Sequence, residues 1–421
     1  MNLIVDDFQQ AGLALAAYAN LATGVPDISA LQDQGRGMSF AQAAQFAKDW
    51  VVVAQYNHIS DPYPIYDAIT GDLVRYDTTT NGLSATVFEE VSTHKRYLAI
   101  RGTDDLYDMA TDIVSVSLLG TTKFQGQYQS LKAKVQEWLA NGTLPATFTV
   151  TGHSLGGFLA TGLAIDFGAN VEHAYLYNAP GVDGLAATQA VANLLKALHI
   201  DERLIETGKF SNLKAAAGPS PIAGLGLPIS PVIPVEIENQ FLSDVSSPPA
   251  ARNHSQQVLT DGLAVYALYA ALAPSLALDQ IGSILKSATN QNKLTLESSL
   301  DALRVTLLGK NTVQTPEGDR DKLYSNLYAL QSSPEYRALA GSATLRVLTA
   351  SDAGSLSSLA KNDFGALVSL NYLLPIAIEG SSGVLGTVHT TLYAQWQADQ
   401  ALTAEQRAKG EGNYTESWLA D

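Results

Sequence analysis

The sequence contains no cysteine. This excludes disulfide bonds, thiolate nucleophiles and zinc sites built from cysteine ligands. Charge is also scarce, because only 16% of the 421 residues are charged, and the 41 acidic residues outnumber the 25 basic ones. The net charge of −16, with no basic cluster to offset it, argues against binding to nucleic acid or to anionic lipid headgroups.

Long hydrophobic runs are missing as well. The longest apolar stretch, GLAVYALYAALAPSLAL from Gly262, is interrupted by Pro274 and is too short to span a bilayer. We interpret it as a buried helix and expect no transmembrane segment.

The N-terminal segment MNLIVDDFQQAGLALAAYANL has acidic residues where a secretory signal peptide has basic ones. Together with the acidic, cysteine-free composition, this favours a bacterial protein secreted without an N-terminal Sec signal, and a cytoplasmic protein is the alternative. The segment NYTESWLAD resembles segments that precede calcium-binding repeats in large exported proteins. We therefore expect the chain to be a fragment, with an export signal beyond Asp421.

The pattern of apolar residues predicts an α/β protein. Residues 1–80 are expected to be mostly helical. Strand and helix then alternate from Leu83 to Leu272, beginning with a hairpin formed by LSATVFEEV and KRYLAIRGT. This alternation predicts a mainly parallel sheet covered on both faces and entered through an antiparallel hairpin. We expect a catalytic domain over residues 1–273 and a mostly helical region of unknown role over 274–421, where strand-like runs vanish.

The stretch TFTVTGHSLGGFLATGLAIDFG predicts a strand, a tight turn and a buried helix, with Ser154 at the tip of the turn. Gly152 and Gly156 remove side chains that would clash with the strand and the helix, and Gly157 allows the helix to pack closely. This is the nucleophile elbow of a serine hydrolase, which presents the serine hydroxyl at the N-terminus of a helix. The alternative is an ordinary serine in a glycine-rich turn.

A serine hydroxyl needs a base, and in this fold the base follows the last strand. His254 is the one of the seven histidines that follows a late predicted strand, PVIPVEIEN, and opens a helix. The other six are too early, inside the elbow, at the wrong end of the sheet or in the helical region. His254 could alternatively be a plain helix-entry residue.

An oxyanion hole is also expected, because the tetrahedral intermediate carries a negative charge on oxygen. The backbone N–H of Leu155, directly after the nucleophile, should be one donor. Thr103, in the loop that follows YLAIRG, should provide the second.

The segments LAIRGT, TVTGHSLGGFLA and AYLYNAPGV together resemble the class 3 lipase family, the fungal-lipase-like α/β-hydrolases. The resemblance covers about residues 83–266 and implies triacylglycerol lipase, phospholipase A1 or related esterase activity. It also implies a lid at LYDMATDIVSVSLLG, whose apolar residues would shield the site in water. A helix that packs on the core is the alternative for that segment.

The triad acid departs from the family pattern, because no carboxylate follows the strand KFSNLKAA. Asp183, after the preceding strand, and Asp244, in the loop before His254, are the candidates. Asp183 is the preferred one, although it could instead cap a helix. A dyad without an acid is also possible.

We therefore expect a serine carboxylic ester hydrolase that acts on lipids through Ser154, His254 and Asp183, with Thr103 and Leu155 as oxyanion donors. This chemistry needs no cofactor and no metal. The lipid ester substrate could be met at a lipid–water interface. The alternatives are a short-chain esterase, an acyltransferase or peptidase, and a non-catalytic α/β-hydrolase module used for binding.

Overall fold

A computed structural model describes residues 3–32, 37–57, 63–66, 73–77, 83–102, 113–181, 207–216, 223–224, 227–238, 253–288, 295–348, 353–415 and 418. The chain divides into two compact units. One comprises Asp6–Leu263, and the other comprises Met1–Val5 with Ala264–Asp421. The division falls inside two helices, at residues 5–6 and 263–264.

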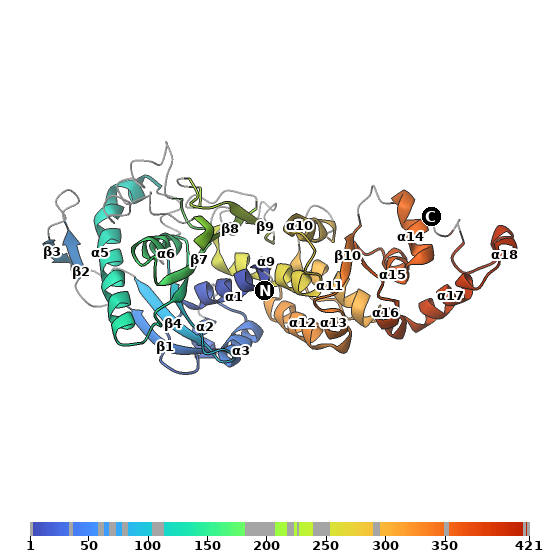
Figure 1. Cartoon of the computed structure of the whole chain (residues 1–421), viewed down its shortest axis with the longest axis horizontal. Coiled ribbons are helices and arrows are strands. Elements are labelled where there is room, and N and C mark those ends of the chain that lie inside the picture. Colours follow the sequence, from blue (N-terminus) through green and yellow to red (C-terminus); the bar gives the residue numbers. More distant parts are fainter. Residues whose placement is uncertain are drawn as a thin grey trace. The chain divides into compact units, whose positions relative to one another are not determined.

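The larger unit is built on a seven-stranded sheet in the order β1-β4-β5-β6-β7-β8-β9 (Figure 1). Its strands are β1 (Trp50–Asn57), β4 (Ser84–Glu90), β5 (Arg96–Ile100), β6 (Phe148–His153), β7 (Val171–Tyr177), β8 (Phe210–Ala215) and β9 (Val232–Val235). The β1–β4 and β4–β5 pairs are antiparallel, and every pair from β5 to β9 is parallel. The predicted α/β-hydrolase fold, with a parallel sheet entered through a hairpin, is confirmed.

The helices of this unit are α1 (Leu3–Ala16), α2 (Ile28–Leu31), α3 (Phe40–Asp49), α5 (Ile113–Ala140), α6 (Leu155–Asp166) and α9 (Gln256–Leu272), with a short 3-10 helix over Thr207–Lys209. α1 and α9 each continue across the division between the units. A separate hairpin pairs β2 (Tyr63–Tyr66) with β3 (Leu73–Asp77).

The expectation that residues 1–80 are mostly helical was wrong for Trp50–Asn57, which is strand β1, and for the β2–β3 hairpin. α3 runs directly into this strand without a glycine or proline to separate them, so no local turn signal marks the change. The three valines 51–53 favour extended backbone because they are β-branched. The strand is stabilised by pairing with β4, and the sequence of residues 50–57 alone does not show this partner.

Both faces of the sheet are covered, as the alternation of apolar side chains requires. On one face, Val87 and Leu98 belong to a core that includes residues of α5 and α6. On the other, Phe88 and Ala99 belong to a core that includes residues of α1 and α3.

Helix α6 is held against α5 by a close contact and by hydrogen bonds. Gly162 is required there, because a Cβ at that position would lie 2.6 Å from the ring of Tyr128. The Tyr128 hydroxyl donates to Asp166 at 2.7 Å, and Lys132 donates to the same carboxylate at 2.7 Å. α5 begins 12 residues before the predicted Gln125, so residues 113–120 of the predicted lid lie in its first turns.

The smaller unit is mostly helical. Its helices are α10 (Leu278–Ser287), α11 (Leu296–Leu308), α12 (Arg320–Ser332), α13 (Pro334–Leu339), α14 (Ala353–Asn362), α15 (Phe364–Tyr372), α16 (Ser382–Val388), α17 (Thr390–Gln400) and α18 (Ala404–Ala408). It also contains an antiparallel pair, β10 (Thr344–Val347) with β11 (Ile376–Glu379), which corrects the expectation that strands vanish after Ala273. Four residues per strand are too few for a clear alternation pattern.

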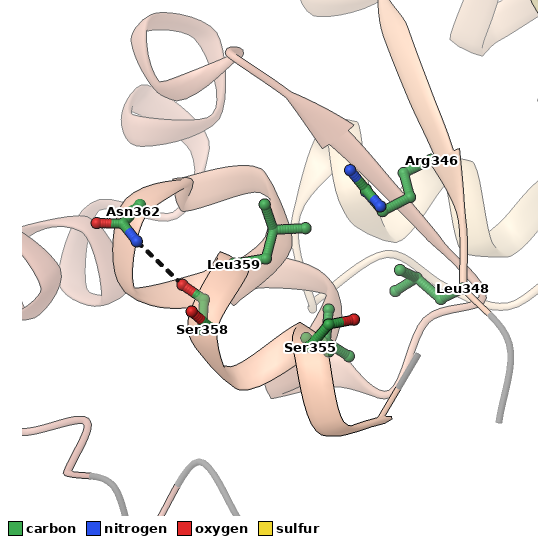
Figure 2. Close-up of a pocket in the computed structure, with 7 residues that line it drawn as sticks. Arg346, Leu348, Ser355, Ser358, Leu359 and Asn362 are labelled. Carbon is green, nitrogen blue, oxygen red and sulfur yellow. Dashed lines mark hydrogen bonds between the residues drawn. The ribbon is translucent and has the colours of Figure 1, made fainter. Parts of the chain in front are cut away.

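A cavity of about 340 Å³ lies between β10 and α14 in the smaller unit (Figure 2). Leu348, Leu356 and Leu359 form its apolar lining. Two of its polar side chains are engaged within the same unit: Arg346 donates to Glu379, and Asn362 donates to the carbonyl oxygen of Ser358 at 3.1 Å.

The apolar stretch from Gly262 lies largely in α9, and its residues 262–270 are buried, as predicted. Across the described ranges, no helix has both the length and the apolar character that a membrane span requires.

Candidate active site

Ser154 occupies a strained turn between β6 and α6. Its backbone angles, φ 56° and ψ −126°, are unfavourable for any residue with a side chain, and it occupies the N-cap position of α6 without a capping hydrogen bond from its side chain. Its N–H donates to the carbonyl oxygen of Tyr177 at 2.8 Å, which fixes the turn to the neighbouring strand. The structure therefore has the strand–turn–helix geometry of a nucleophile elbow.

The glycines of the motif are required by close contacts. A Cβ on Gly157 would lie 2.7 Å from the Cβ of Ala179, and one on Gly152 would lie 2.7 Å from the amide nitrogen of Gly157. A Cβ on Gly156 would lie 2.8 Å from the carbonyl carbon of Arg101. The elbow is thus packed directly against the end of β5, where the predicted oxyanion loop begins.

His254 lies beside the nucleophile. Its Nε2 is 2.8 Å from the Oγ of Ser154, although 100 residues separate the two in the sequence. The geometry allows the serine hydroxyl to donate to the imidazole, which is the arrangement that a general base requires. Both side chains are buried, so bulk water does not compete for this hydrogen bond.

Burial sets the protonation state of the imidazole. It lowers the pKa of His254 well below the usual range for histidine, and the nearby His153 lowers it further. Burial also lowers the pKa of His153 to about 4, against the opposing effect of its hydrogen bond to the backbone of His254. Both rings are therefore neutral at pH 7, and His254 can accept a proton.

Leu155 begins α6 directly after the nucleophile. N–H groups in the first turn of a helix have no acceptor inside the helix and point toward its N-terminal end. The N–H of Leu155 therefore has no acceptor within α6, and its role as an oxyanion donor stays a prediction. The other predicted donor, Thr103, lies outside the described residues, as do both candidate acids, Asp183 and Asp244, and residues 106–112 of the predicted lid.

The structure places the remaining described histidines elsewhere. His173, on β7, contacts the Oγ of Ser211 at 2.9 Å, and His389 donates from Nε2 to the carbonyl oxygen of Thr306 at 2.8 Å. His94 lies at the exposed turn of the β4–β5 hairpin, beside Glu89. The described residues include no group of three or more His, Cys, Asp or Glu side chains that could bind a metal ion.

Three residues near the Ser154–His254 pair were not predicted from the sequence: His153, Tyr18 and Asn178. The Nε2 of His153 lies 2.6 Å from the carbonyl oxygen of His254, and its Nδ1 lies 2.7 Å from the hydroxyl of Tyr18. Asn178 donates to the carbonyl oxygen of Asn253 at 3.2 Å. His153 and Asn178 do stand in the quoted motifs, but only tertiary contacts show what they bond to.

Residues 97–182, from β5 through the elbow to just beyond β7, match the family model described as lipase (class 3). Among solved structures, Lip2 lipase from Yarrowia lipolytica shares 18% identity over 61% of this chain and 93% of its own, with a TM-score of 0.34. Lipase II from Rhizopus niveus shares 17% identity over 51% and 72%, with a TM-score of 0.28. No curated protein matches the chain.

Both TM-scores are low, so the fold assignment depends on the strand order and the elbow. The family match supports the resemblance to class 3 lipases and includes Ser154, whereas His254 lies beyond it. Together with the neutral, buried Ser154–His254 pair, the match identifies a serine carboxylic ester hydrolase.

Proposed function

We propose that this chain hydrolyses lipid esters, as a triacylglycerol lipase or a phospholipase A1-like enzyme, through an acyl-enzyme on Ser154. The observation that carries the proposal is the 2.8 Å contact between the Ser154 Oγ and the His254 Nε2 at a strained elbow. Strain of this kind costs about 1–3 kcal/mol, and it persists at sites where function requires the geometry.

Acylation begins when the Ser154 Oγ attacks the ester carbonyl carbon and its proton passes to Nε2 of His254. The carbonyl π electrons move to oxygen, where the N–H of Leu155 and, as we propose, that of Thr103 donate to the oxyanion. The carbonyl then re-forms and the bond from carbon to the alcohol oxygen breaks. The imidazolium returns its proton to that oxygen, so an alcohol leaves and the acyl group remains on Ser154.

Deacylation repeats these steps with water. His254 removes a proton from water as the water oxygen attacks the acyl carbon, and it then protonates the Ser154 Oγ as that bond breaks. A carboxylic acid leaves and the enzyme is regenerated. An acid at His254 Nδ1 would orient the ring and stabilise the imidazolium, and we propose Asp183 for this role, with Asp244 as the alternative.

A lipid substrate is favoured by the class 3 lipase match and by the predicted lid, whose apolar residues include Met109 and Ile113. The net charge of −16 favours esters with neutral or zwitterionic headgroups, because anionic headgroups would be repelled. The bacterial origin and the export of the protein without a Sec signal stay predictions.

The test is a panel of p-nitrophenyl esters from two to sixteen carbons, with trioctanoin and phosphatidylcholine alongside and a fluorophosphonate probe for the nucleophile. We expect labelling of the wild type, none of Ser154→Ala, and rates that rise with acyl length. A sharp preference for acetate would replace the lipase proposal by a simple esterase. A wild type that neither labels nor hydrolyses any ester would reject the catalytic proposal.

A further inference from the structure

We propose that His254 is aimed at Ser154 by a clamp on its main chain, in which His153 and Asn178 hold two consecutive carbonyl groups and Tyr18 holds His153. These three would be positioning residues, because they act through His254. This inference rests on the proposed ester hydrolysis. Its basis is four hydrogen bonds that join residues from five separate parts of the chain.

The first half of the clamp fixes the tautomer of His153. Its Nε2 faces the carbonyl oxygen of His254 at 2.6 Å, and a carbonyl oxygen can only accept, so Nε2 carries the hydrogen. The ring is neutral at pH 7, because burial lowers its pKa to about 4. Nδ1 then presents a lone pair, and the hydroxyl of Tyr18 must donate to it over 2.7 Å. The hydrogen bonds therefore run in one direction, from Tyr18 through His153 to the backbone of His254.

Tyr18 is well placed to hold the ring, because it follows α1 and reaches the elbow. Its hydroxyl would lie 2.7 Å from a Cβ on Gly102, and the same Cβ would lie 3.3 Å from the Cβ of Ser154. The Tyr18 hydroxyl thus sits beside the end of β5, close to the nucleophile. Glycine is needed at position 102, because any side chain there would displace the Tyr18 hydroxyl.

The second half of the clamp is Asn178, which follows β7. It adopts a left-handed backbone with φ 45°, a conformation that asparagine tolerates better than most residues. Its Nδ2 donates to the carbonyl oxygen of Asn253 at 3.2 Å, and its Oδ1 accepts the N–H of Ala215 at 3.2 Å. One buried side chain therefore ties the end of β8 to the residue before His254.

The two halves give the nucleophile and the base a common frame. His153 is the residue before Ser154, and the N–H of Ser154 bonds to Tyr177, the residue before Asn178. The groups that hold carbonyls 253 and 254 thus belong to the same two strand ends that hold the serine. Releasing either carbonyl would let the imidazole of His254 move away from the Ser154 Oγ. A misplacement of about 1 Å can lower the rate 10²-fold.

The experiment is a double-mutant cycle on kcat in the full chain. His153→Phe keeps a ring but removes both nitrogens, and we expect kcat to fall by about 10- to 100-fold with KM changed less than about twofold. His153→Gln keeps a side-chain N–H near the Nε2 position and should restore about tenfold. Tyr18→Phe should lower kcat several-fold alone, and should have no further effect in the His153→Phe background, because the relay is already broken.

Tyr336→Phe is the matched control. It also removes a buried tyrosine hydroxyl, one that donates to the carbonyl oxygen of Leu268 at 2.7 Å in the smaller unit. We expect kcat to stay at the wild-type value. Circular dichroism at the assay temperature gives the folded fraction of each variant, so that kcat can be expressed per folded molecule.

Three results would overturn the clamp: an unchanged kcat in His153→Phe, a loss that disappears when corrected for the folded fraction, or effects of Tyr18→Phe and His153→Phe that multiply. If the wild type hydrolyses no ester, the proposed function fails, but the clamp can still be tested. The ¹⁵N resonances of the imidazoles report the tautomer of His153 without any substrate. A proton on Nε2 supports the clamp, and a proton on Nδ1 rejects it.

Discussion

The main-chain oxygen of Asp7 accepts a hydrogen bond of 2.5 Å from the hydroxyl of Tyr177, which joins α1 to β7. The Asp7 side chain is only 3% exposed. Burial, followed by repulsion from Asp6, raises the pKa of the Asp7 carboxyl to about 7, against the opposing effect of a hydrogen bond from Ser211. A carboxyl of this kind makes the stability of the larger unit depend on pH.

The direction in which pH changes the stability follows from the number of protons bound in each state. The folded pKa of about 7 lies above the unfolded value of 3.8, so the folded state binds more protons between these values and loses stability as pH rises through that window. Asp7→Asn should therefore stabilise the protein at pH 8, by roughly 2–4 kcal/mol, and change little at pH 4. Urea unfolding at both pH values measures this.

Asp6→Asn provides the comparison for Asp7→Asn. Burial also raises the pKa of Asp6, but this neighbour is less buried. We expect a smaller gain at pH 8 than for Asp7→Asn. Equal gains, or a loss of stability in Asp7→Asn at pH 8, would contradict a buried carboxyl at position 7.

Activity should also depend on pH through His254, which must be neutral to act as a base. Because burial lowers its pKa well below the usual 6.5, protonation should switch off hydrolysis only well below that pH. The acidic limb of kcat/KM, measured with a soluble ester, should then have its midpoint well below the usual 6.5 of histidine. A midpoint at or above 6.5 would show that the imidazole is not desolvated as described.

The nucleophile can be tested against a second serine–histidine contact in the same unit. Ser211 Oγ and His173 Nε2 lie 2.9 Å apart, but Ser211 is an ordinary strand residue of β8. We expect Ser154→Ala to lose about 10⁵- to 10⁶-fold in kcat and Ser211→Ala to keep wild-type kcat. Initial rates and fluorophosphonate labelling distinguish the two, and labelling of Ser211 in a Ser154→Ala chain would refute the assignment.

The close packing of the elbow predicts the effect of a single methyl group. Gly157→Ala would place a Cβ 2.7 Å from that of Ala179 and 3.0 Å from the Gly152 carbonyl oxygen, so we expect a loss of about 1–3 kcal/mol in unfolding free energy. Gly12→Ala in α1 is the matched control, because nothing lies within 4 Å of its added Cβ. It should be neutral or stabilise by up to about 1 kcal/mol. Thermal unfolding of both variants measures the contrast, and a neutral Gly157→Ala would contradict it.

The elements that sequence predicts well carry their own local signals. β6 and α6 are recognisable because an apolar strand, a glycine-rich turn and an apolar helix follow one another without interruption. His254 could be found because the order of strands restricts where a base can lie. The first signal depends on residues that are close in sequence and the second on the order of predicted strands, so a single sequence is enough to show both.

The elements that sequence misses depend on distant partners. β1 is stabilised by pairing with β4, and β10 by pairing with β11 about thirty residues away. The role of Tyr18 depends on a contact with His153, 135 residues further along. The sequence around this tyrosine does not indicate such a contact, because hydrogen bonds between distant side chains produce no periodic pattern of residues.

The backbone at Ser154 has φ 56° and ψ −126°, a conformation that glycine adopts freely and serine does not. The serine therefore provides the nucleophilic oxygen and lowers the stability of the fold at the same position. Replacing this serine by glycine would relieve the backbone strain and remove the nucleophile at the same time. A Ser154→Gly variant should accordingly be inactive and more resistant to heat than the wild type.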